Sequence, residues 1–111
     1  MEQTPLHERA CVPCKGGMPP MNRGQAETMA ARVEGWMLAD DALSIGHDFK
    51  FKDFKEAMAF VNAVAELAEM EGHHPDIHVT GWNKVRLDLS THAIKGLSDN
   101  DFILAAKINR L

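Results

Sequence analysis

The chain has 111 residues, of which 45% are hydrophobic and 25% are charged. These values are typical of one globular domain, and they exclude a wholly disordered chain, a collagen-like repeat and a coiled-coil rod. Twelve Lys and Arg stand against 16 Asp and Glu, and the net charge of −4 offers no global basic field to nucleic acid. No apolar run approaches the ~20 residues that cross a bilayer. The first residues lack a secretory signal, so we expect a cytoplasmic protein with no nucleic-acid or membrane partner.

Residues 1–21 are predicted to form an extended arm ahead of a single domain over 22–111, because this segment is proline-rich and has no apolar periodicity. Both cysteines, Cys11 and Cys14, lie in the arm. Their spacing is compatible with a redox dithiol, with half of a zinc site, or with a turn-rich segment that simply covers the domain. The neighbouring prolines and glycines favour the last of these.

Three helices are predicted from capping and periodicity. Asn22 with Gln25 opens the first, which should end near residue 34, before the helix-stopping Gly35. Asp53 with Glu56 opens the second, which Gly72 closes. Its predicted apolar stripe consists of Phe54, Ala57, Met58, Val61, Val64, Ala65 and Ala68. Ser98 with Asp101 opens the third, whose predicted apolar residues are Phe102, Ala105, Ala106 and Leu111.

The strands show a period of two. Residues 43–51 alternate as a half-buried strand in which Gly46 is expected to mark a bulge, and a short strand is expected around residues 36–38. The segments around 77–80 and 84–91 alternate as well, and Gly81-Trp82-Asn83 between them predicts an antiparallel hairpin. The predicted fold is therefore α+β, with an antiparallel sheet of about four strands and three α-helices packed on one face.

Three histidines lie where predicted elements end. His73 and His74 follow Gly72, and Pro75 biases His74 towards an extended backbone, so the two imidazoles should point to opposite sides. His92 ends the second hairpin strand, in phase with its polar residues, and is expected on the polar face of the sheet. Imidazoles exchange protons near neutral pH, which suits general acid–base catalysis.

The residues alone leave three interpretations of these histidines open: proton transfer, a three-imidazole metal site, or a structural role. Adjacent histidines rarely ligate one ion together. Gly16-Gly17 precedes no strand–loop–helix unit and so forms no phosphate loop. The only thiols lie in the arm, which argues against a covalent nucleophile.

Six short motifs follow one another along the chain. They are Gly35-Trp36, residues 49–54, His73-His74-Pro75-Asp76, Gly81-Trp82-Asn83-Lys84-Val85, Ser90-Thr91-His92, and Gly96-Leu97-Ser98 with Asp101. This ordered set resembles the signature of the pterin-4a-carbinolamine dehydratases over about two-thirds of the chain. The arm resembles an extension of plant-like and some bacterial members, in which a Cys-x-x-Cys pair precedes Gly16-Gly17-x-Pro19-Pro20.

The resemblance implies dehydration of 4a-hydroxytetrahydrobiopterin to quinonoid dihydropterin, in tetrahydrobiopterin recycling, without a metal or cofactor. It implies that His73 and His92 handle the protons and that His74 orients the substrate. Asp101 would orient a histidine or cap a helix, and Trp82 would stack on the pterin or cover the hairpin. The implied substrate-binding residues are Gly72, Pro75, Trp82, Ser90, Thr91, Ala93 and Asp101.

The same resemblance implies a homodimer or homotetramer and coupling to an aromatic amino acid hydroxylase. Two alternatives follow from it. One is a protein-binding module that stabilises a transcription-factor dimer, as in animal members. The other is recycling of another pterin, such as molybdopterin, through the same pocket.

Overall fold

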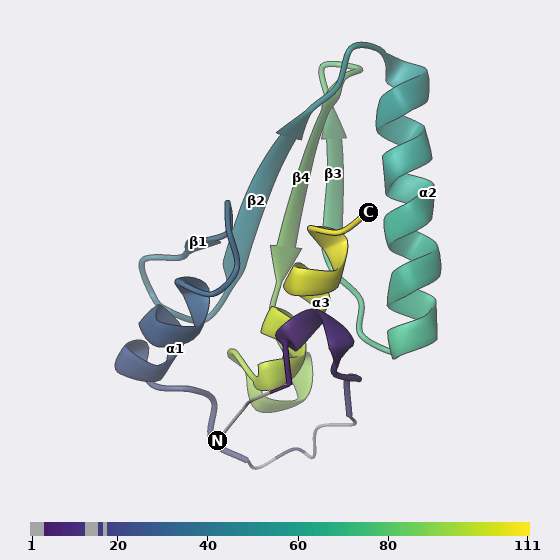
Figure 1. Cartoon of the computed structure of the whole chain (residues 1–111). Helices are drawn as coiled ribbons and strands as arrows, with labels where there is room; N and C mark the ends of the chain where they lie inside the picture. Colours follow the sequence, from purple (N-terminus) through teal and green to yellow (C-terminus); the bar gives the residue numbers. More distant parts are fainter. Residues whose placement is uncertain (1–3, 13–15, 17) are drawn as a thin grey trace.

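In the computed structural model, which describes residues 4–12, 16 and 18–111, a twisted four-stranded antiparallel sheet carries the helices (Figure 1). The strand order is β1-β2-β4-β3. The strands are β1 (Met37–Leu38), β2 (Ile45–Lys50), β3 (Asp76–Thr80) and β4 (Lys84–Leu89). The helices are α1 (Arg23–Ala30), α2 (Phe54–Glu71) and α3 (Asp99–Ile108), with short 3₁₀ turns η1 (Leu6–Glu8) and η2 (His92–Ile94). The predicted α+β class, the short strand β1 and the β3–β4 hairpin are confirmed.

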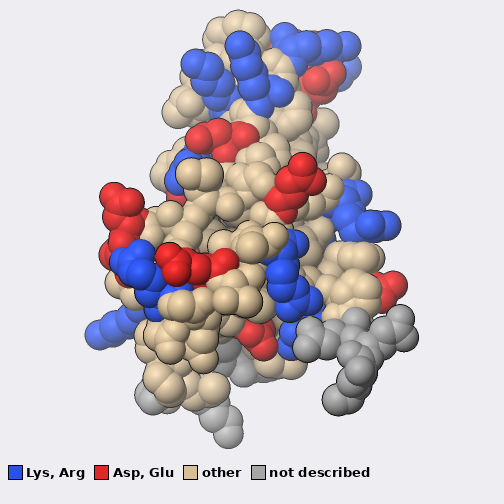
Figure 2. Space-filling model, turned by 60° about the vertical axis from the view of Figure 1, so that its left-hand side comes forward, with Lys and Arg blue, Asp and Glu red and all other residues tan. Residues whose placement is uncertain are grey.

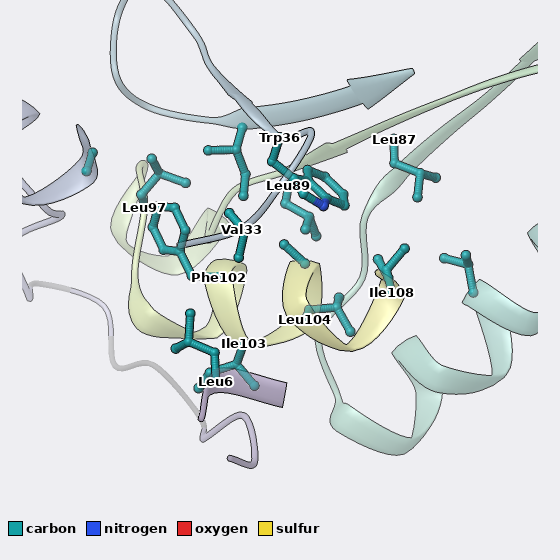
Figure 3. Packing of buried hydrophobic residues seen from close by; sticks show 14 of the residues in the cluster. Leu6, Val33, Trp36, Leu87, Leu89, Leu97, Phe102, Ile103, Leu104 and Ile108 are labelled. Atoms are coloured by element: carbon teal, nitrogen blue, oxygen red, sulfur yellow. The ribbon is translucent and has the colours of Figure 1, made fainter. Parts of the chain in front are cut away.

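The two faces of the sheet differ in chemistry because side chains alternate along each strand. Leu87 and Leu89 of β4 are fully buried, and burial of each such side chain contributes about 1.5–3 kcal/mol. They pack in one core with the buried residues of α2 and α3 (Figure 3). On the opposite face Arg86 donates hydrogen bonds to Asp48 at 3.0 Å and to Asp88 at 3.1 Å. The helices therefore cover one face, and ion pairs occupy the other.

Helix α2 is rotated relative to the predicted stripe. Ala57, Val64 and Ala68 face the core as expected, but Phe54 is 54% exposed and Ala65 is also exposed. Phe60 and Leu67, which were not in the predicted stripe, pack against the core instead. Both rows are apolar and lie on adjacent flanks of the helix, so periodicity alone does not decide which one the sheet covers.

Three further expectations are corrected. Helix α1 ends at Ala30, not near residue 34, and turns lead from there to Gly35. Gly46 marks no bulge, because β2 pairs with β4 in continuous register; a Cβ there would collide with the guanidinium of Arg86. Helix α3 ends at Ile108, which leaves Leu111 exposed beyond the helix, outside the core.

The described part of the N-terminal segment lies against α3. Leu6 is buried, and Figure 3 shows its side chain beside Ile103. Cys14 lies outside the described residues, so the Cys-x-x-Cys interpretation and the division into 1–21 and 22–111 stay predictions. Among the described residues, no helix is both long and apolar enough to span a membrane.

The surface carries both signs of charge. Figure 2 shows Lys and Arg side chains gathered at the end of the molecule that is uppermost in Figure 1. Lys50 and Lys84, which pair across β2 and β4, belong to this end, as does Lys52 before α2. The histidine-bearing segments that follow α2 and β4 begin at the opposite end of the sheet.

Candidate active site

His73 is placed by the end of helix α2. Gly72 adopts the left-handed conformation, with φ of +67°, which glycine adopts without steric cost. The His73 backbone N–H then donates to Ala68 at 3.2 Å and closes the helix. The His73 side chain is only 11% exposed, and its Nε2 lies 2.6 Å from Oδ1 of Asp101. The end of α2 and the first turn of α3 therefore meet in one side-chain contact.

Asp101 is a fully buried carboxylate with three partners. Its Oδ1 contacts His73, and its Oδ2 accepts from the Thr91 hydroxyl at 2.8 Å and from the Ser98 backbone N–H at 3.0 Å. The Ser98 contact caps α3 as predicted. One side chain thus caps the helix and contacts the histidine, which are the two alternatives that the sequence left open for Asp101.

The contact with Asp101 fixes the tautomer of His73. An ionised carboxylate only accepts hydrogen bonds, so Nε2 must carry the hydrogen that is donated to Oδ1. In the neutral ring, Nδ1 is then the lone-pair nitrogen and the atom that takes up a proton. The Thr91 hydroxyl, which donates its one hydrogen to Asp101, accepts from the Ser98 hydroxyl at 2.7 Å. The ring is therefore held by a hydrogen-bonded chain of buried groups.

His74 points away from this chain, as the adjacent positions predicted. Its Nε2 lies 3.3 Å from Oε1 of Glu69, and the two side chains are 60% and 80% exposed. An ion pair this exposed contributes little to stability. Pro75 is half-buried and leads into β3. His74 is therefore beside His73 in the chain but free to contact a bound molecule from solvent.

His92 does not lie on the polar face of the sheet, and that expectation is wrong. Strand β4 ends at Leu89, and Thr91 forms a separate bridge with Gly96. His92 begins η2 and is exposed, as is Ala93 after it, so the strand's alternation no longer applies. Because the Thr91 hydroxyl binds Asp101, the residue next to His92 is fixed to the carboxylate that holds His73. Ser90, half-buried, joins β4 to this segment.

Trp82 lies far from the other candidate site residues of this chain. It lies at the tip of the hairpin, is 60% exposed, and has φ of +62°. Asp76 begins β3 beside the histidines, so about 16 Å of strand, at ~3.3 Å per residue, separate it from the hairpin tip. Buried Asn83 anchors the hairpin tip, because its side-chain amide donates a hydrogen bond to the Phe51 carbonyl at 3.0 Å.

Sequence reasoning missed two residues beside the site. Oε1 of Glu71 accepts from the Cys11 backbone N–H at 2.9 Å, and Oδ1 of Asn100 accepts from the Val12 backbone N–H at 2.9 Å. The Cys11 N–H is the main cause that lowers the pKa of Glu71. Burial, with the nearby Glu71 carboxylate, raises the pKa of the Cys11 thiol to about 12. No local pattern marked these partners, because they are 60 and 88 residues apart in sequence.

Across residues 4–12, 16 and 18–111, no group of three or more His, Cys, Asp or Glu side chains is arranged to hold a metal ion. The described geometry is instead one histidine of fixed tautomer, with two exposed histidines on segments joined to it. Such a site has the groups to donate and accept protons.

A family model described as pterin 4 alpha carbinolamine dehydratase matches residues 19–111. The chain belongs to this family. A protein of Halorhodospira halophila named for the same dehydratase is 50% identical over 106 residues, which cover 96% of each chain. The mitochondrial pterin-4-alpha-carbinolamine dehydratase 2 of Arabidopsis thaliana is 45% identical over 109 residues, which cover 96% of this chain and 58% of that protein.

Two solved structures share the fold. A Brucella melitensis protein described as a transcriptional coactivator/pterin dehydratase is 31% identical, with a TM-score of 0.76, over 82% of this chain and 96% of its own. A pterin dehydratase-like RuBisCO assembly factor of the α-carboxysome is 23% identical with a TM-score of 0.59, over 69% of this chain and 88% of its own, and shows the fold alone. The dehydratase family predicted from the motifs is confirmed, and with it the class of hydro-lyase.

Proposed function

We propose that this chain dehydrates a 4a-hydroxytetrahydropterin to the quinonoid dihydropterin by histidine general acid–base catalysis. The observation that carries the proposal is the 2.6 Å contact between His73 and fully buried Asp101, in a member of the dehydratase family. A carboxylate without access to solvent is costly to keep unless it is paired. Here its partners orient one imidazole, as a proton carrier requires.

The reaction needs only two proton movements. The C4a–O bond breaks, and the departing hydroxyl takes a proton and leaves as water. The N5–H bond gives up its proton, and the electron pair forms the N5=C4a double bond. Nothing is oxidised or reduced, so two positioned proton carriers are sufficient.

The placement of the histidines suggests how they divide this work. His73 offers Nδ1 for proton exchange, because Nε2 is engaged by Asp101. His92 is the second proton carrier, on the exposed start of η2 next to Thr91. His74, exposed on the other side of the extended chain, orients the substrate. Main-chain groups near Gly72, Ser90 and Ala93 hold the edge of the pteridine.

The direct test is stopped-flow absorbance of 4a-hydroxytetrahydropterin, generated by a hydroxylase, with and without the protein. We expect faster decay with the wild type and loss of that acceleration in the His73→Ala, His92→Ala double variant. His78→Ala is the matched control, because His78 is 58% exposed on the sheet, where it pairs with Asp88. Decay that the wild type does not accelerate would refute the dehydratase.

The biological setting is a further part of the proposal. We place the reaction in tetrahydrobiopterin recycling in the cytoplasm, downstream of an aromatic amino acid hydroxylase that forms the hydroxylated pterin. Competition between a biopterin and a molybdopterin-type substrate for the same variant-sensitive site would decide which pterin is natural. Preference for the latter would contradict recycling but not the acid–base chemistry.

The chain is also proposed to form a homodimer or homotetramer. The flank of α2 that the sheet leaves uncovered carries Phe54, Met58 and Ala65, of which Phe54 is 54% exposed. Burial of this row against a second copy would remove it from water. Light scattering after size exclusion should give an oligomer for the wild type and a smaller species for Phe54→Glu. A monomeric wild type at micromolar concentration would refute this.

Protein binding is the second candidate function. The description of the similar Brucella protein as a coactivator favours it, and the α2 row is its surface where a partner, rather than a second copy, covers that row. The His73→Ala, His92→Ala variant separates the two functions, because it removes proton carriers and leaves the α2 row unchanged. A partner that binds this variant and the wild type equally, but not Phe54→Glu, would support a binding role.

A further inference from the structure

The N-terminal segment Leu6–Val12, which we call the strap, connects the two elements that form the His73–Asp101 contact. The Cys11 backbone N–H donates to Glu71 at the end of α2. The next residue, Val12, pairs with Asn100 at the start of α3 twice: its N–H donates to Oδ1 at 2.9 Å, and its carbonyl accepts from the Asn100 amide. Two consecutive strap residues thus bind α2 and α3 at once.

The anchors of the strap lie directly beside the site. Glu71 is two residues before His73, and Asn100 is the residue before Asp101. The bridge through Cys11 and Val12 therefore runs parallel to the bond between His73 and Asp101. A change in the separation of α2 and α3 would stretch both connections together.

Asn100 is buried and Glu71 is largely buried, which distinguishes both from contacts between exposed side chains. Asn100 is 4% exposed. The side chain of Glu71 is 13% exposed, and its Oε2 also pairs with Lys107 of α3 at 3.4 Å. A buried amide or carboxylate that loses its partner costs more than the net value of the bond, so these groups favour the bound strap. Leu6 adds a buried apolar contact on α3 (Figure 3).

The N-terminal segment also reaches the third part of the site. At Gly16, a Cβ would stand 3.5 Å from the carbonyl oxygen of Ala93, the residue after His92. The segment thus meets the chain beside His73, beside Asp101 and beside His92.

We propose that the strap positions the proton carriers of the dehydration: through Glu71 and Asn100 it fixes the separation of α2 and α3 at which His73 and Asp101 form their hydrogen bond. This inference rests on the proposed dehydratase. Glu71 and Asn100 are positioning residues, since they act through His73 and Asp101.

The test is a matched pair of variants at an exposed position. Val12 is 64% exposed, so Val12→Ala shortens a solvent-facing side chain and retains the N–H that donates a hydrogen bond to Asn100. Val12→Pro removes that N–H. Because a displacement near 1 Å lowers a rate by up to ~100-fold, we expect Val12→Pro to lower kcat roughly 10- to 100-fold. We expect KM to stay near the wild-type value, and Val12→Ala to behave as the wild type.

Asn100→Ala and Glu71→Gln complete the series. Asn100→Ala removes both hydrogen bonds to Val12 and should resemble Val12→Pro, whereas Glu71→Gln keeps an acceptor for the Cys11 N–H and should largely retain kcat. Arg9→Ala is the control for a strap contact outside this bridge. Arg9 pairs with Asp99 at 3.3 Å, and the two side chains are 39% and 54% exposed. Equal kcat for Val12→Pro and Val12→Ala would overturn the proposal, even if both were destabilised.

A second measurement separates this inference from the dehydratase itself. The Nε2–H of His73 should give a slowly exchanging ring N–H resonance, assigned by its absence in His73→Ala. Val12→Pro should broaden that resonance or speed its exchange, and Val12→Ala should not. If the wild type shows no turnover but the resonance responds, the dehydratase fails and the strap stands. If the resonance is the same in both Val12 variants, the strap fails whatever the turnover.

Discussion

Asp101→Asn is the substitution whose consequences the structure defines most closely. The two side chains have the same shape, but the amide has one accepting oxygen and one donating nitrogen, whereas the carboxylate accepts at both oxygens. Thr91 and the Ser98 N–H both donate to Oδ2, so the amide oxygen takes that place. The amide nitrogen then faces His73 at the position of Oδ1.

The amide therefore reverses the tautomer of His73. A donor at 2.6 Å requires that Nε2 accept, which moves the hydrogen of the neutral ring to Nδ1. The proposed proton acceptor thus becomes a donor. Since a positioned acid or base contributes about 10²–10⁴-fold to a rate, we expect kcat to fall by an amount in that range.

The stability cost should be modest by comparison. A charge-assisted hydrogen bond is replaced by a neutral one, and the difference is about 1–1.5 kcal/mol. Asp101→Ala leaves the donors of His73, Thr91 and Ser98 without their acceptor and should cost about 3–5 kcal/mol. Comparison of the two variants separates loss of the tautomer from loss of the fold.

Stopped-flow turnover and urea unfolding measure the two effects on the same preparations. Asp88→Asn is the matched control, because Asp88 also lies beside a histidine, His78, but on the open face of the sheet. A folded Asp101→Asn protein with wild-type kcat would refute the role assigned to the His73–Asp101 pair. An equal loss in Asp88→Asn would refute its specificity.

Three further predictions concern stability and reactivity. The Cys11 N–H holds the pKa of Glu71 below 4.5. The stabilisation that this carboxylate gives is therefore present above pH 4.5 and is lost as the pH falls through the lowered pKa. Measured by urea unfolding, Glu71→Gln should lose less stability between about pH 6 and pH 3 than the wild type does. Burial raises the pKa of Cys11 from 9.0 to about 12, so in a Cys14→Ser background iodoacetamide should label it on the order of a thousandfold more slowly at pH 8 than an unperturbed thiol. Gly72→Ala meets open space at φ of +67° and should cost about 1–2 kcal/mol, whereas Gly35→Ala also drives a Cβ into a neighbouring ring and should lower Tm further.

The sequence predicted the elements whose signals are local. The capping side chains of Asn22 and Asp101 begin helices as expected, and Gly72 ends α2. At Asp53 only half of the expected capping box forms: its side chain accepts from Glu56 N–H at 2.8 Å, but Glu56 reaches Lys52 instead. These features are set by groups within four residues of each other, which is why a single sequence contains them.

The errors arose where distant residues decide. Gly46 is required by Arg86 on the neighbouring strand rather than by a bulge. The inward flank of α2 is chosen by the sheet, not by periodicity, since Phe54 and Phe60 are equally apolar. His92 was placed by extending the period of β4 past its end at Leu89, where the Thr91–Gly96 bridge begins a different turn.

The candidate site followed from the resemblance rather than from spacing. His73 and Asp101 are 28 residues apart, and no local pattern links them. Asn100 lies in the first turn of α3 and carries no signal that distinguishes it from an ordinary helix residue, yet it is buried under the strap. Contacts of this kind join residues that are far apart in sequence, so only the three-dimensional structure reveals them.

The double role of Asp101 determines which substitutions at this site affect stability and which affect activity. The atom that satisfies the Ser98 N–H at the start of α3 belongs to the carboxylate that orients His73, so helix formation and proton transfer depend on one side chain. Asp101→Ala should therefore lower stability and activity together, whereas Asp101→Asn, which keeps an acceptor for the Ser98 N–H, should lower mainly activity. His74 and His92 are exposed, and each can be replaced with little effect on packing. Variants of the three histidines should therefore lose comparable activity. Only the variants that disturb Asp101 or its partners should also lose substantial stability, because Asp101 is the one buried carboxylate of the site.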